Sequence, residues 1–212
     1  IHPLMKKALS STDILAKKHK TFEFTGAFLD AFDRPSRVGT WFIWGNSGNG
    51  KNNFLLQLAK ELSKFEKIYW WELEEFQHDT FQKAWQRNNM HDCKTRIKVI
   101  DDTLDELKAR LKKRESPNIV IINSYQYTFM SFKDYLDLKN EFSNKLFVII
   151  SQCEGKNPVG KTALKVMYDA SLKIWVEGYK AFSKGRYIGS NGGEYVVWNE
   201  GAQSYWGNIN IN

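Results

Sequence analysis

The residues with the clearest chemical meaning lie near position 50. Three glycines, one lysine and several amides stand together in the order Gly45, Asn46, Ser47, Gly48, Asn49, Gly50, Lys51, Asn52 and Asn53. Glycines let a chain turn its backbone N–H groups inward around phosphate oxygens, and a helix that begins there adds the positive end of its dipole. The ammonium of Lys51 would reach the β and γ phosphates. These residues predict a P-loop that binds ATP, rather than a glycine-rich turn without a ligand.

Two positions where such a loop needs magnesium ligands carry amides instead. The residue after the lysine should be Ser or Thr, whose hydroxyl binds Mg²⁺, but it is Asn52. The acidic residue expected at the end of a later apolar strand is replaced by Asn123. Asn52 and Asn123 therefore predict an impaired Mg²⁺ site. Two explanations stay open: a nucleotide-binding protein that does not hydrolyse ATP, or a chain in which Thr and Asp have been replaced.

The elements that must position these residues alternate along the chain. Residues 1–37 are predicted to form an arm or linker, and residues 38–212 a core. Strands are expected at 40–44, 67–73, 97–100, 118–122 and 146–150, and helices at 51–64, 80–89, 104–114 and 131–142. A loop rich in Gly, Lys and Pro is expected at 154–162, and strands with a hairpin turn at 189–193 follow in the tail. This order predicts an α/β fold with a mostly parallel, twisted sheet covered by helices.

Composition limits the class of protein. The chain has 212 residues with a net charge of +7, so a single basic core and a polyanionic partner are expected. No apolar run approaches the length of a membrane span, so no membrane partner is expected. Two cysteines, Cys93 and Cys153, suit a reducing, cytoplasmic location, and the four histidines lack the spacing of a zinc site. The eight tryptophans are expected mainly in the core, with base stacking as the alternative.

From about Gly39 to Trp198 the chain resembles the RecA-type ATPase core of DnaB-type replicative helicases and RadA-type recombination proteins. Several short motifs follow the family's order: the P-loop, Leu73-Glu74-Glu75, Asn123-Ser124-Tyr125-Gln126 in place of Asp-Tyr-Leu-Gln, Ser151-Gln152, Asp169-Ala170, and Lys184-Gly185-Arg186 before Gly189 and Gly192. The resemblance implies a RecA-like P-loop NTPase with a C-terminal β-hairpin. The large N-terminal domain of DnaB-type helicases and the zinc finger of RadA-type proteins have no counterpart in these residues.

The resemblance also implies roles for particular side chains. Glu74 would polarise the attacking water, and Gln152 would sense the γ-phosphate. Lys184 and Arg186 would reach the nucleotide of a neighbouring subunit, which requires a homo-oligomeric ring or filament. The loop after Gln152 would bind single-stranded DNA through Lys156, Lys161 and Lys165. Each role has an alternative: a solvated acidic strand end, a basic hairpin, and an ordinary surface loop.

Three functions are compatible with this pattern. The first is an ATP-dependent replication or recombination motor or accessory ATPase that acts on DNA, from a phage or mobile element. The second is a nucleotide-binding interaction module without catalysis, which Asn52 and Asn123 favour. Retention of Glu74, Gln152 and Arg186 favours the motor. The third, a small-molecule phosphotransferase, lacks an evident acceptor site and would be monomeric.

Overall fold

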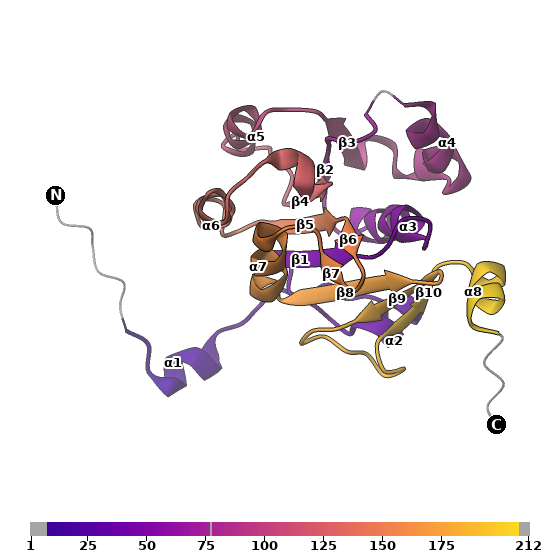
Figure 1. The fold of residues 1–212 in the computed structure, drawn as a ribbon. Helices are drawn as coiled ribbons and strands as arrows, with labels where there is room; N and C mark the ends of the chain where they lie inside the picture. The colour runs from indigo at the N-terminus through magenta and orange to yellow at the C-terminus, as the bar shows by residue number, and fades with distance from the viewer. Residues whose placement is uncertain (1–7, 77, 208–212) are drawn as a thin grey trace.

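A mixed eight-stranded sheet forms the centre of the protein. A computed structural model describes residues 8–76 and 78–207 and gives the strand order β10-β9-β8-β1-β5-β4-β2-β3 (Figure 1). Strands β8, β1, β5, β4, β2 and β3 run parallel, and β9 and β10 add an antiparallel extension. The strands are β1 (Gly39–Trp44), β2 (Ile68–Glu72), β3 (Ile97–Ile100), β4 (Ile119–Asn123), β5 (Leu146–Ser151), β8 (Leu172–Glu177), β9 (Lys180–Ser183) and β10 (Glu194–Val196). The predicted mostly parallel sheet with a C-terminal hairpin is confirmed.

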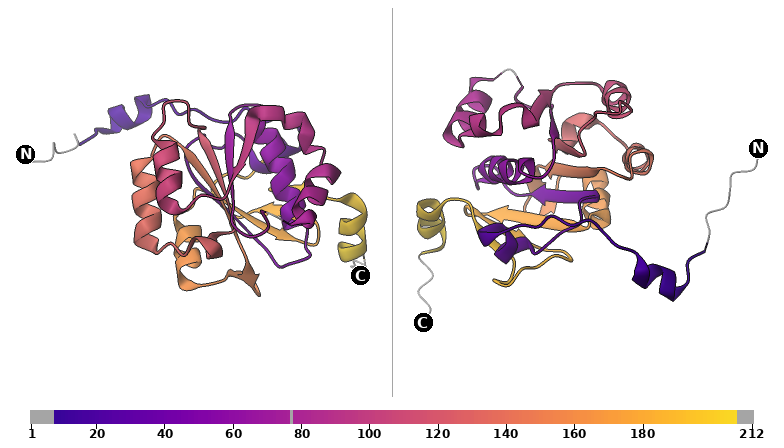
Figure 2. Two further views of the ribbon diagram at one scale, coloured as in Figure 1. Left: turned by 90° about the horizontal axis from the view of Figure 1, so that it is seen from above. Right: turned by 180° about the vertical axis from the view of Figure 1, so that it is seen from behind.

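Helices cover both faces of the sheet (Figure 2). One face packs against α2 (Gly26–Phe32), α3 (Lys51–Ser63) and α4 (Asp79–Arg87), and the other against α5 (Leu104–Leu111), α6 (Phe132–Glu141) and α7 (Lys161–Asp169). Short 3₁₀ turns η1 (Met90–Arg96) and η2 (Tyr125–Thr128) and helix α8 (Asn199–Trp206) complete the order. Across residues 8–76 and 78–207, no helix combines the length and apolar character that crossing a membrane requires.

The central strands read as continuous apolar runs because both of their faces are covered. Every residue of β4 and β5 is buried. Adjacent side chains on a strand point to opposite faces, so the paired tryptophans divide between the two cores. Trp41 and Trp70 join the core under α3, while Trp44 and Trp71 join the core under α6. The expectation that these tryptophans are mainly packing residues is confirmed.

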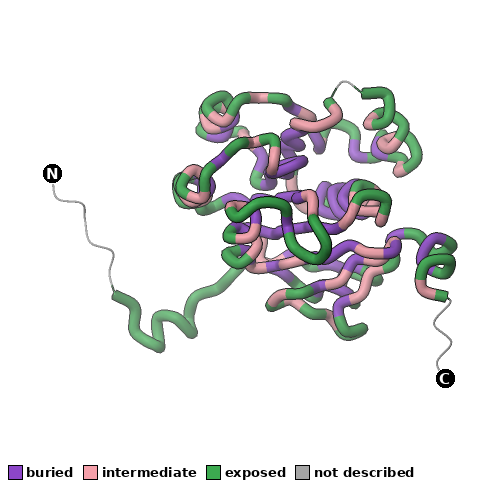
Figure 3. Tube along the Cα trace, viewed as in Figure 1, coloured by how far each residue is buried: buried purple, intermediate pink, exposed green. Residues whose placement is uncertain are grey.

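The segment before β1 has two structurally different parts. Helix α1 (Ser11–Ala16) projects from the body and contains no buried residue (Figure 3). Its start is fixed by a capping box between Ser10 and Asp13. From Thr21 onward the chain packs on the sheet: Phe22 and Phe24 are 0% and 1% exposed, and both rings meet Trp41. The part of the predicted arm that is integrated into the core therefore begins near Thr21.

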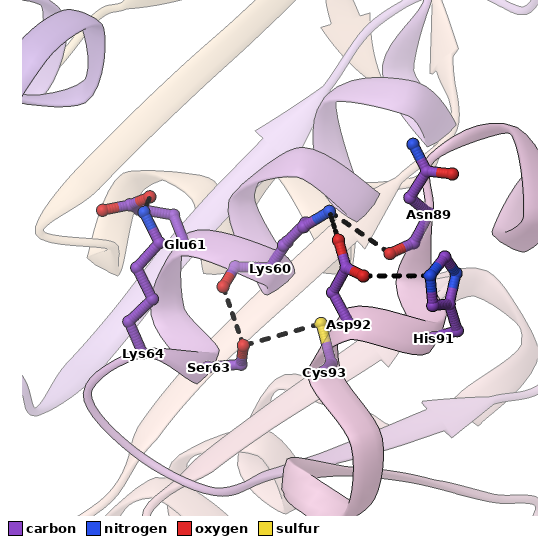
Figure 4. A network of polar contacts seen from close by, with 8 residues as sticks. All are labelled: Lys60, Glu61, Ser63, Lys64, Asn89, His91, Asp92 and Cys93. Atoms are coloured by element: carbon purple, nitrogen blue, oxygen red, sulfur yellow. Dashed lines mark hydrogen bonds and ion pairs between the residues drawn. The ribbon is translucent and has the colours of Figure 1, made fainter.

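Helix α3 is anchored at its far end, which keeps its first turn in place. Lys60 Nζ donates to the carbonyl of Asn89 at 3.2 Å and to Asp92 at 2.6 Å, which ties α3 to η1 (Figure 4). Ser63 Oγ lies 3.6 Å from the sulfur of Cys93, beside the same junction. On the core side, α3 buries apolar residues at helical spacing, including Phe54 and Leu58.

The tail contains more regular structure than the sequence indicated. The expected loop at 154–162 includes a small hairpin formed by β6 (Cys153–Glu154) and β7 (Asn157–Pro158). A tight turn at Gly178 and Tyr179, both with positive φ, joins β8 to β9, and the expected glycine-rich turn lies in the longer connection between β9 and β10. Two-residue hairpin turns need positive φ at both central positions, which Tyr179 does not signal.

Candidate nucleotide-binding site

The P-loop joins β1 to α3 at the carboxyl edge of the sheet. Gly50 adopts a left-handed conformation, φ 90°, at the N-cap of α3, and Gly48 has φ 78°. These conformations favour glycine and leave the first N–H groups of α3 free to face an anion. Strand β1 is followed by α3 on one face and its neighbour β5 by α7 on the opposite face. A crevice at such a point is where open α/β sheets bind ligands.

The loop is braced from the side by β8 and the turn that follows. A Cβ atom at Gly45 would lie 2.1 Å from the carbonyl oxygen of Val176, so only glycine fits this position. Asn49 accepts a hydrogen bond from the backbone N–H of Gly178 at 2.8 Å and donates to the carbonyl of Ser47 at 3.1 Å. Asn49 thus stiffens the loop and links it to the β8–β9 turn.

The site residues gather around two cavities that meet at the P-loop. The inner cavity has a volume of about 380 Å³ and is lined by Gly45, Ser47, Lys51, Asn52, Glu74, Glu75, Asn123, Ser124, Ile150, Gln152 and Cys153. The outer cavity, about 270 Å³, is lined by Asn46, Ser47, Gly48, Gly50, Lys51, Asn52, Asn53, Arg87 and Tyr179. Lys51 and Asn52 border both cavities. A polyphosphate lying along the loop would therefore pass from one cavity to the other.

Lys51 is the cation at the centre of this arrangement. Burial lowers the pKa of its ammonium, and the negative charge of Glu74 partly offsets that effect. Cys153 lies beside it, and burial raises the pKa of the Cys153 thiol although Lys51 opposes the change. An ammonium that has lost part of its water shell gains more from a phosphate than one in bulk water. Lys51 is placed to act as the main electrostatic anchor for phosphate.

Glu74 and Gln152, predicted from separate motifs, are brought together. The Nε2 atom of Gln152 donates to Glu74 Oε1 at 3.2 Å across the inner cavity. Gln126 holds Gln152 from behind, because its Oε1 accepts from the Gln152 backbone N–H at 3.1 Å. The Nε2 atom of Gln126 donates to Ser151 Oγ and to the carbonyl of Val159. The end of β5 and the segment after it therefore form one hydrogen-bonded unit beside Glu74.

One residue of this site was not singled out by sequence reasoning. Glu72, the last residue of β2, is 0% exposed and accepts four hydrogen bonds. The donors are the Trp70 indole and the Asn123 amide, both at 2.8 Å, and the backbone N–H groups of Glu74 and Glu75, both at 3.1 Å. In the sequence, Glu72 is one of three nearby glutamates, a pattern equally typical of a solvated strand end. Only its register opposite Asn123 reveals the network.

Arg87 and Tyr179 are also additions from the structure. Arg87 ends α4, and Tyr179 occupies the β8–β9 turn, yet both line the outer cavity beside the P-loop. The Tyr179 ring would lie 3.0 Å from a Cβ atom at Gly50 and meets Trp198 edge-on at 5.0 Å. A guanidinium and an aromatic ring are groups that bind phosphate and a planar base. No sequence motif marks either residue.

The remaining predicted residues lie away from the two cavities. Lys184 and Lys156 line a third cavity of about 480 Å³ with Trp44, Trp175, Glu177, Lys180, Phe182, Glu194 and Trp206. Arg186 is exposed in the connection after β9. Lys161 and Lys165 are exposed on α7. Neither Lys184 nor Arg186 lines the cavities around the P-loop of its own chain, so a role for them at a nucleotide requires a second subunit.

The residues fit a nucleotide with its metal. The described part of the chain holds no group of three or more His, Cys, Asp or Glu side chains that could bind a metal by themselves. Mg²⁺ in nucleotide sites needs only one or two protein ligands, because phosphate and water complete its shell. Asn52 and Asn123 both line the inner cavity and carry amide oxygens, which are suitable neutral ligands. The predicted magnesium positions are thus adjacent to the predicted phosphate position.

Comparisons with known proteins agree on the fold. No protein-family model matches the chain, and no curated protein matches its sequence. Among solved structures, flagellar accessory protein FlaH from Methanocaldococcus jannaschii is similar with a TM-score of 0.59 and 13% identity, over 84% of this chain and 92% of that one. A KaiC-like protein from Pyrococcus horikoshii OT3 has a TM-score of 0.57 and 15% identity, over 80% and 94%. The ATPase domain of a DnaB-type helicase has a TM-score of 0.50 and 15% identity, over 74% and 78%.

These likenesses are at the level of the backbone. At 13–15% identity they show that the chain has the RecA-like P-loop ATPase fold, which confirms the predicted fold class. The order of strands and the site at the carboxyl edge of β1 agree with that fold. The reaction and the partners of this chain have to be argued from its own residues.

Proposed function

We propose that this chain binds ATP at the P-loop, hydrolyses it, and uses the cycle to act on DNA as a replication or recombination motor or accessory ATPase. The observation that carries the proposal is the convergence on one cavity of three side chains from separate elements. Lys51 begins α3, Glu74 follows β2, and Gln152 follows β5, and all three line the inner cavity. A nucleotide-binding loop without a reaction has no need of the other two side chains.

Each side chain has a distinct task in this proposal. The backbone N–H groups of the P-loop and the Lys51 ammonium bind the phosphates and offset their charge. Glu74 orients a water molecule toward the γ-phosphate and accepts its proton. Gln152, bonded to Glu74 at 3.2 Å, responds when that contact is replaced by one to phosphate. Bound Mg²⁺ would supply further charge neutralisation on the phosphate oxygens, held near the amide oxygens of Asn52 and Asn123.

Action on DNA is supported by a mechanical link between the P-loop and the β6–β7 hairpin. Trp44, which precedes the loop, donates to the carbonyl of Lys156 at 3.0 Å, and Asn46 donates to the carbonyl of Gly155 at 3.3 Å. The Cys153 thiol lies 3.1 Å from Asn46 Oδ1. A shift of the loop on nucleotide binding would therefore move the hairpin that carries Lys156. Exposed Lys161 and Lys165 lie farther along the same segment and suit phosphate contacts.

A homo-oligomer follows from the position of the basic residues after β9. Strand β9 runs antiparallel to β8, so its end lies at the opposite edge of the sheet from the P-loop. Lys184 and Arg186 are exposed there. In a ring or filament they would approach the nucleotide of the next subunit and stabilise the charge that develops during hydrolysis.

A second candidate function is a nucleotide-binding module that does not hydrolyse ATP. It is favoured by one observation: the two expected magnesium positions, Asn52 and Asn123, are both uncharged amides at the inner cavity. Weak placement of the metal would leave phosphate binding intact and slow the reaction. Such a protein would act as a loader, a regulator or an inactive ring subunit.

The deciding experiment is ATP turnover in Mg²⁺ with and without single-stranded DNA, with Lys51→Ala as the control. The proposal expects turnover that DNA stimulates and that Lys51→Ala abolishes. Lys156→Ala should reduce the stimulation, whereas Lys67→Ala, the same change at an exposed site just before β2, should not. ATP binding without turnover above the Lys51→Ala level would establish the binding module instead.

A further inference from the structure

A carboxylate without a cationic partner is buried at the end of β2. Glu72 is 0% exposed, and among the described residues no Lys, Arg or His forms an ion pair with it. An ionised carboxylate in such a place is strongly unfavourable unless N–H donors fill its lone pairs. Four donors do so at 2.8–3.1 Å. The donor set matches an ionised carboxylate, which accepts hydrogen bonds at both oxygens and donates none.

Asn123 is the donor that connects this carboxylate to the inner cavity. Glu72 and Asn123 are directly opposed in the parallel register of β2 and β4. Because the carboxylate only accepts, the amide must turn its nitrogen toward Glu72, and Nδ2 lies 2.8 Å from Oε2. Asn123 also lines the cavity, so its amide oxygen is the atom left for a ligand. A bond to a charged acceptor polarises the amide and makes that oxygen more electronegative.

The other oxygen of Glu72 fixes the backbone that carries Glu74. Oε1 accepts from the N–H groups of Glu74 and Glu75, both at 3.1 Å, and closes the turn after β2. The Glu74 side chain then reaches Gln152 at 3.2 Å across the cavity. One buried side chain thus holds both the position of Glu74 and the orientation of Asn123.

We propose that Glu72 is the positioning residue of this site and that Glu72 and Asn123 act as an exchanged pair. The acid absent from the end of β4 is carried by Glu72 on β2, and Asn123 presents its polarised amide oxygen to the metal–phosphate position. In this arrangement Asn123 is a requirement of the buried Glu72, because an aspartate there would face a second carboxylate. The magnesium part of the inference rests on the proposed nucleotide function, and the pairing itself does not.

The pairing is tested on the protein without ligand, by thermal unfolding at neutral pH. Asn123→Asp places two carboxylates at contact distance in a buried site, and a Tm loss of roughly 10 °C is expected. Asn118→Asp is the matched control, because Asn118 donates to Glu66 at 3.1 Å in an exposed pair near the start of the same strand. That change should shift Tm by no more than about 2 °C. Equal effects of the two substitutions would overturn the pairing.

The double variant Glu72→Gln with Asn123→Asp exchanges the acid and the amide. It should recover at least half of the Tm loss of Asn123→Asp, since the new glutamine donates to the new aspartate. Recovery is incomplete because the Trp70 indole N–H, which now donates to Glu72 Oε2, would face the amide nitrogen. A double variant no more stable than Asn123→Asp alone would contradict the exchange.

The link to the metal is tested by ADP affinity with and without Mg²⁺, measured by calorimetry. Glu72→Gln should reduce the Mg²⁺-dependent gain in ADP affinity roughly tenfold and change metal-free ADP binding by less than about twofold. The double variant, which has its carboxylate at position 123, should regain the Mg²⁺ effect and serves in place of a poorly folded Glu72→Gln. An unchanged Mg²⁺ effect in both variants would overturn the inference. Absence of ADP binding to the unmodified protein would reject the proposed function alone, because the Tm comparisons need no nucleotide.

Discussion

Two buried polar networks lie at opposite edges of the parallel sheet, and they are balanced differently. At the amino edge, Thr40 bonds Tyr135 at 2.8 Å, and the Tyr135 hydroxyl donates to Asp169, which also pairs with Lys139 at 2.5 Å. That network ends in a partly exposed ion pair of opposite charges. At the carboxyl edge, Glu72 is satisfied only by neutral N–H donors among the described residues.

The difference shows what each network can do. A carboxylate neutralised by a cation contributes to packing and leaves little field outside the network. A carboxylate held by neutral donors keeps its negative charge next to the cavity that contains Lys51 and Asn123. The amino-edge network is therefore interpreted as structural, and the carboxyl-edge network as part of the nucleotide site.

The largest effect is expected from Glu72→Ala. The change leaves two side-chain donors and two backbone N–H groups without their acceptor in a buried site, so the free energy of unfolding should fall by about 3–5 kcal/mol. Urea denaturation measures this loss. Glu66→Ala removes a half-buried carboxylate at the other edge and should cost less than about 1 kcal/mol. A loss for Glu72→Ala as small as that of Glu66→Ala would remove the distinction between the edges.

Gly45→Ala is expected to have the next largest effect, about 2–3 kcal/mol, because its Cβ would lie 2.1 Å from the Val176 carbonyl oxygen. The displaced strand end should also weaken nucleotide binding. Gly48→Ala meets no heavy atom within 4 Å and is strained only by its φ of 78°, so about 1–2 kcal/mol is expected. Urea denaturation of both variants compares steric with conformational strain. A reversed order would show that the β8 contact with Gly45 is not rigid.

Tyr135→Phe tests the amino edge with an intermediate effect. The ring stays in the core, but Thr40 loses a hydrogen-bond partner and Asp169 a donor. The free energy of unfolding should fall by about 1–2 kcal/mol in the same assay. Nucleotide affinity should be unchanged, because this network does not border the P-loop cavities. A variant that folds normally but binds nucleotide more weakly would contradict the structural assignment.

Asp169→Asn should have the smallest effect and a distinct pH dependence. Burial would raise the pKa of Asp169, but hydrogen bonds from Lys139 and Tyr135 outweigh it and hold the pKa below the ordinary value of 3.8. Its contribution is therefore present above pH 3.8 and is lost as the pH falls through the lowered pKa. The stability difference between the unmodified protein and the variant should stay below about 1 kcal/mol at neutral pH and shrink in acid. A difference that grows in acid would mean that the pKa is raised instead.

Much of the fold was predictable because local patterns sufficed. The apolar run before Asn123 and the glycine-rich octapeptide indicated a strand and a phosphate loop without knowledge of their neighbours. Residues 21–37 were harder, because Phe22 and Phe24 lie in a short segment without helical or strand periodicity. They are buried only because Trp41 and Phe65 provide partners from distant parts of the chain.

The candidate site divides in the same way. Lys51, Glu74 and Gln152 could be predicted as site residues because each belongs to a motif at the end of its own strand. The meaning of Asn123 could not, since an amide in place of an acid looks like a defect until Glu72 is seen opposite it. Tyr179 and Arg87 likewise reach the P-loop only through the turn of a hairpin and the end of a helix.

Short-range patterns along the chain were enough to specify the alternation of strands and helices, the phosphate loop and the presence of acids after β2, because these depend on backbone conformation and local spacing. Which of Glu72, Glu74 and Glu75 is buried, and which faces the cavity, depended on the folded arrangement. Burial of a charge requires donors that surround it, and those donors come from two strands separated by 51 residues along the chain.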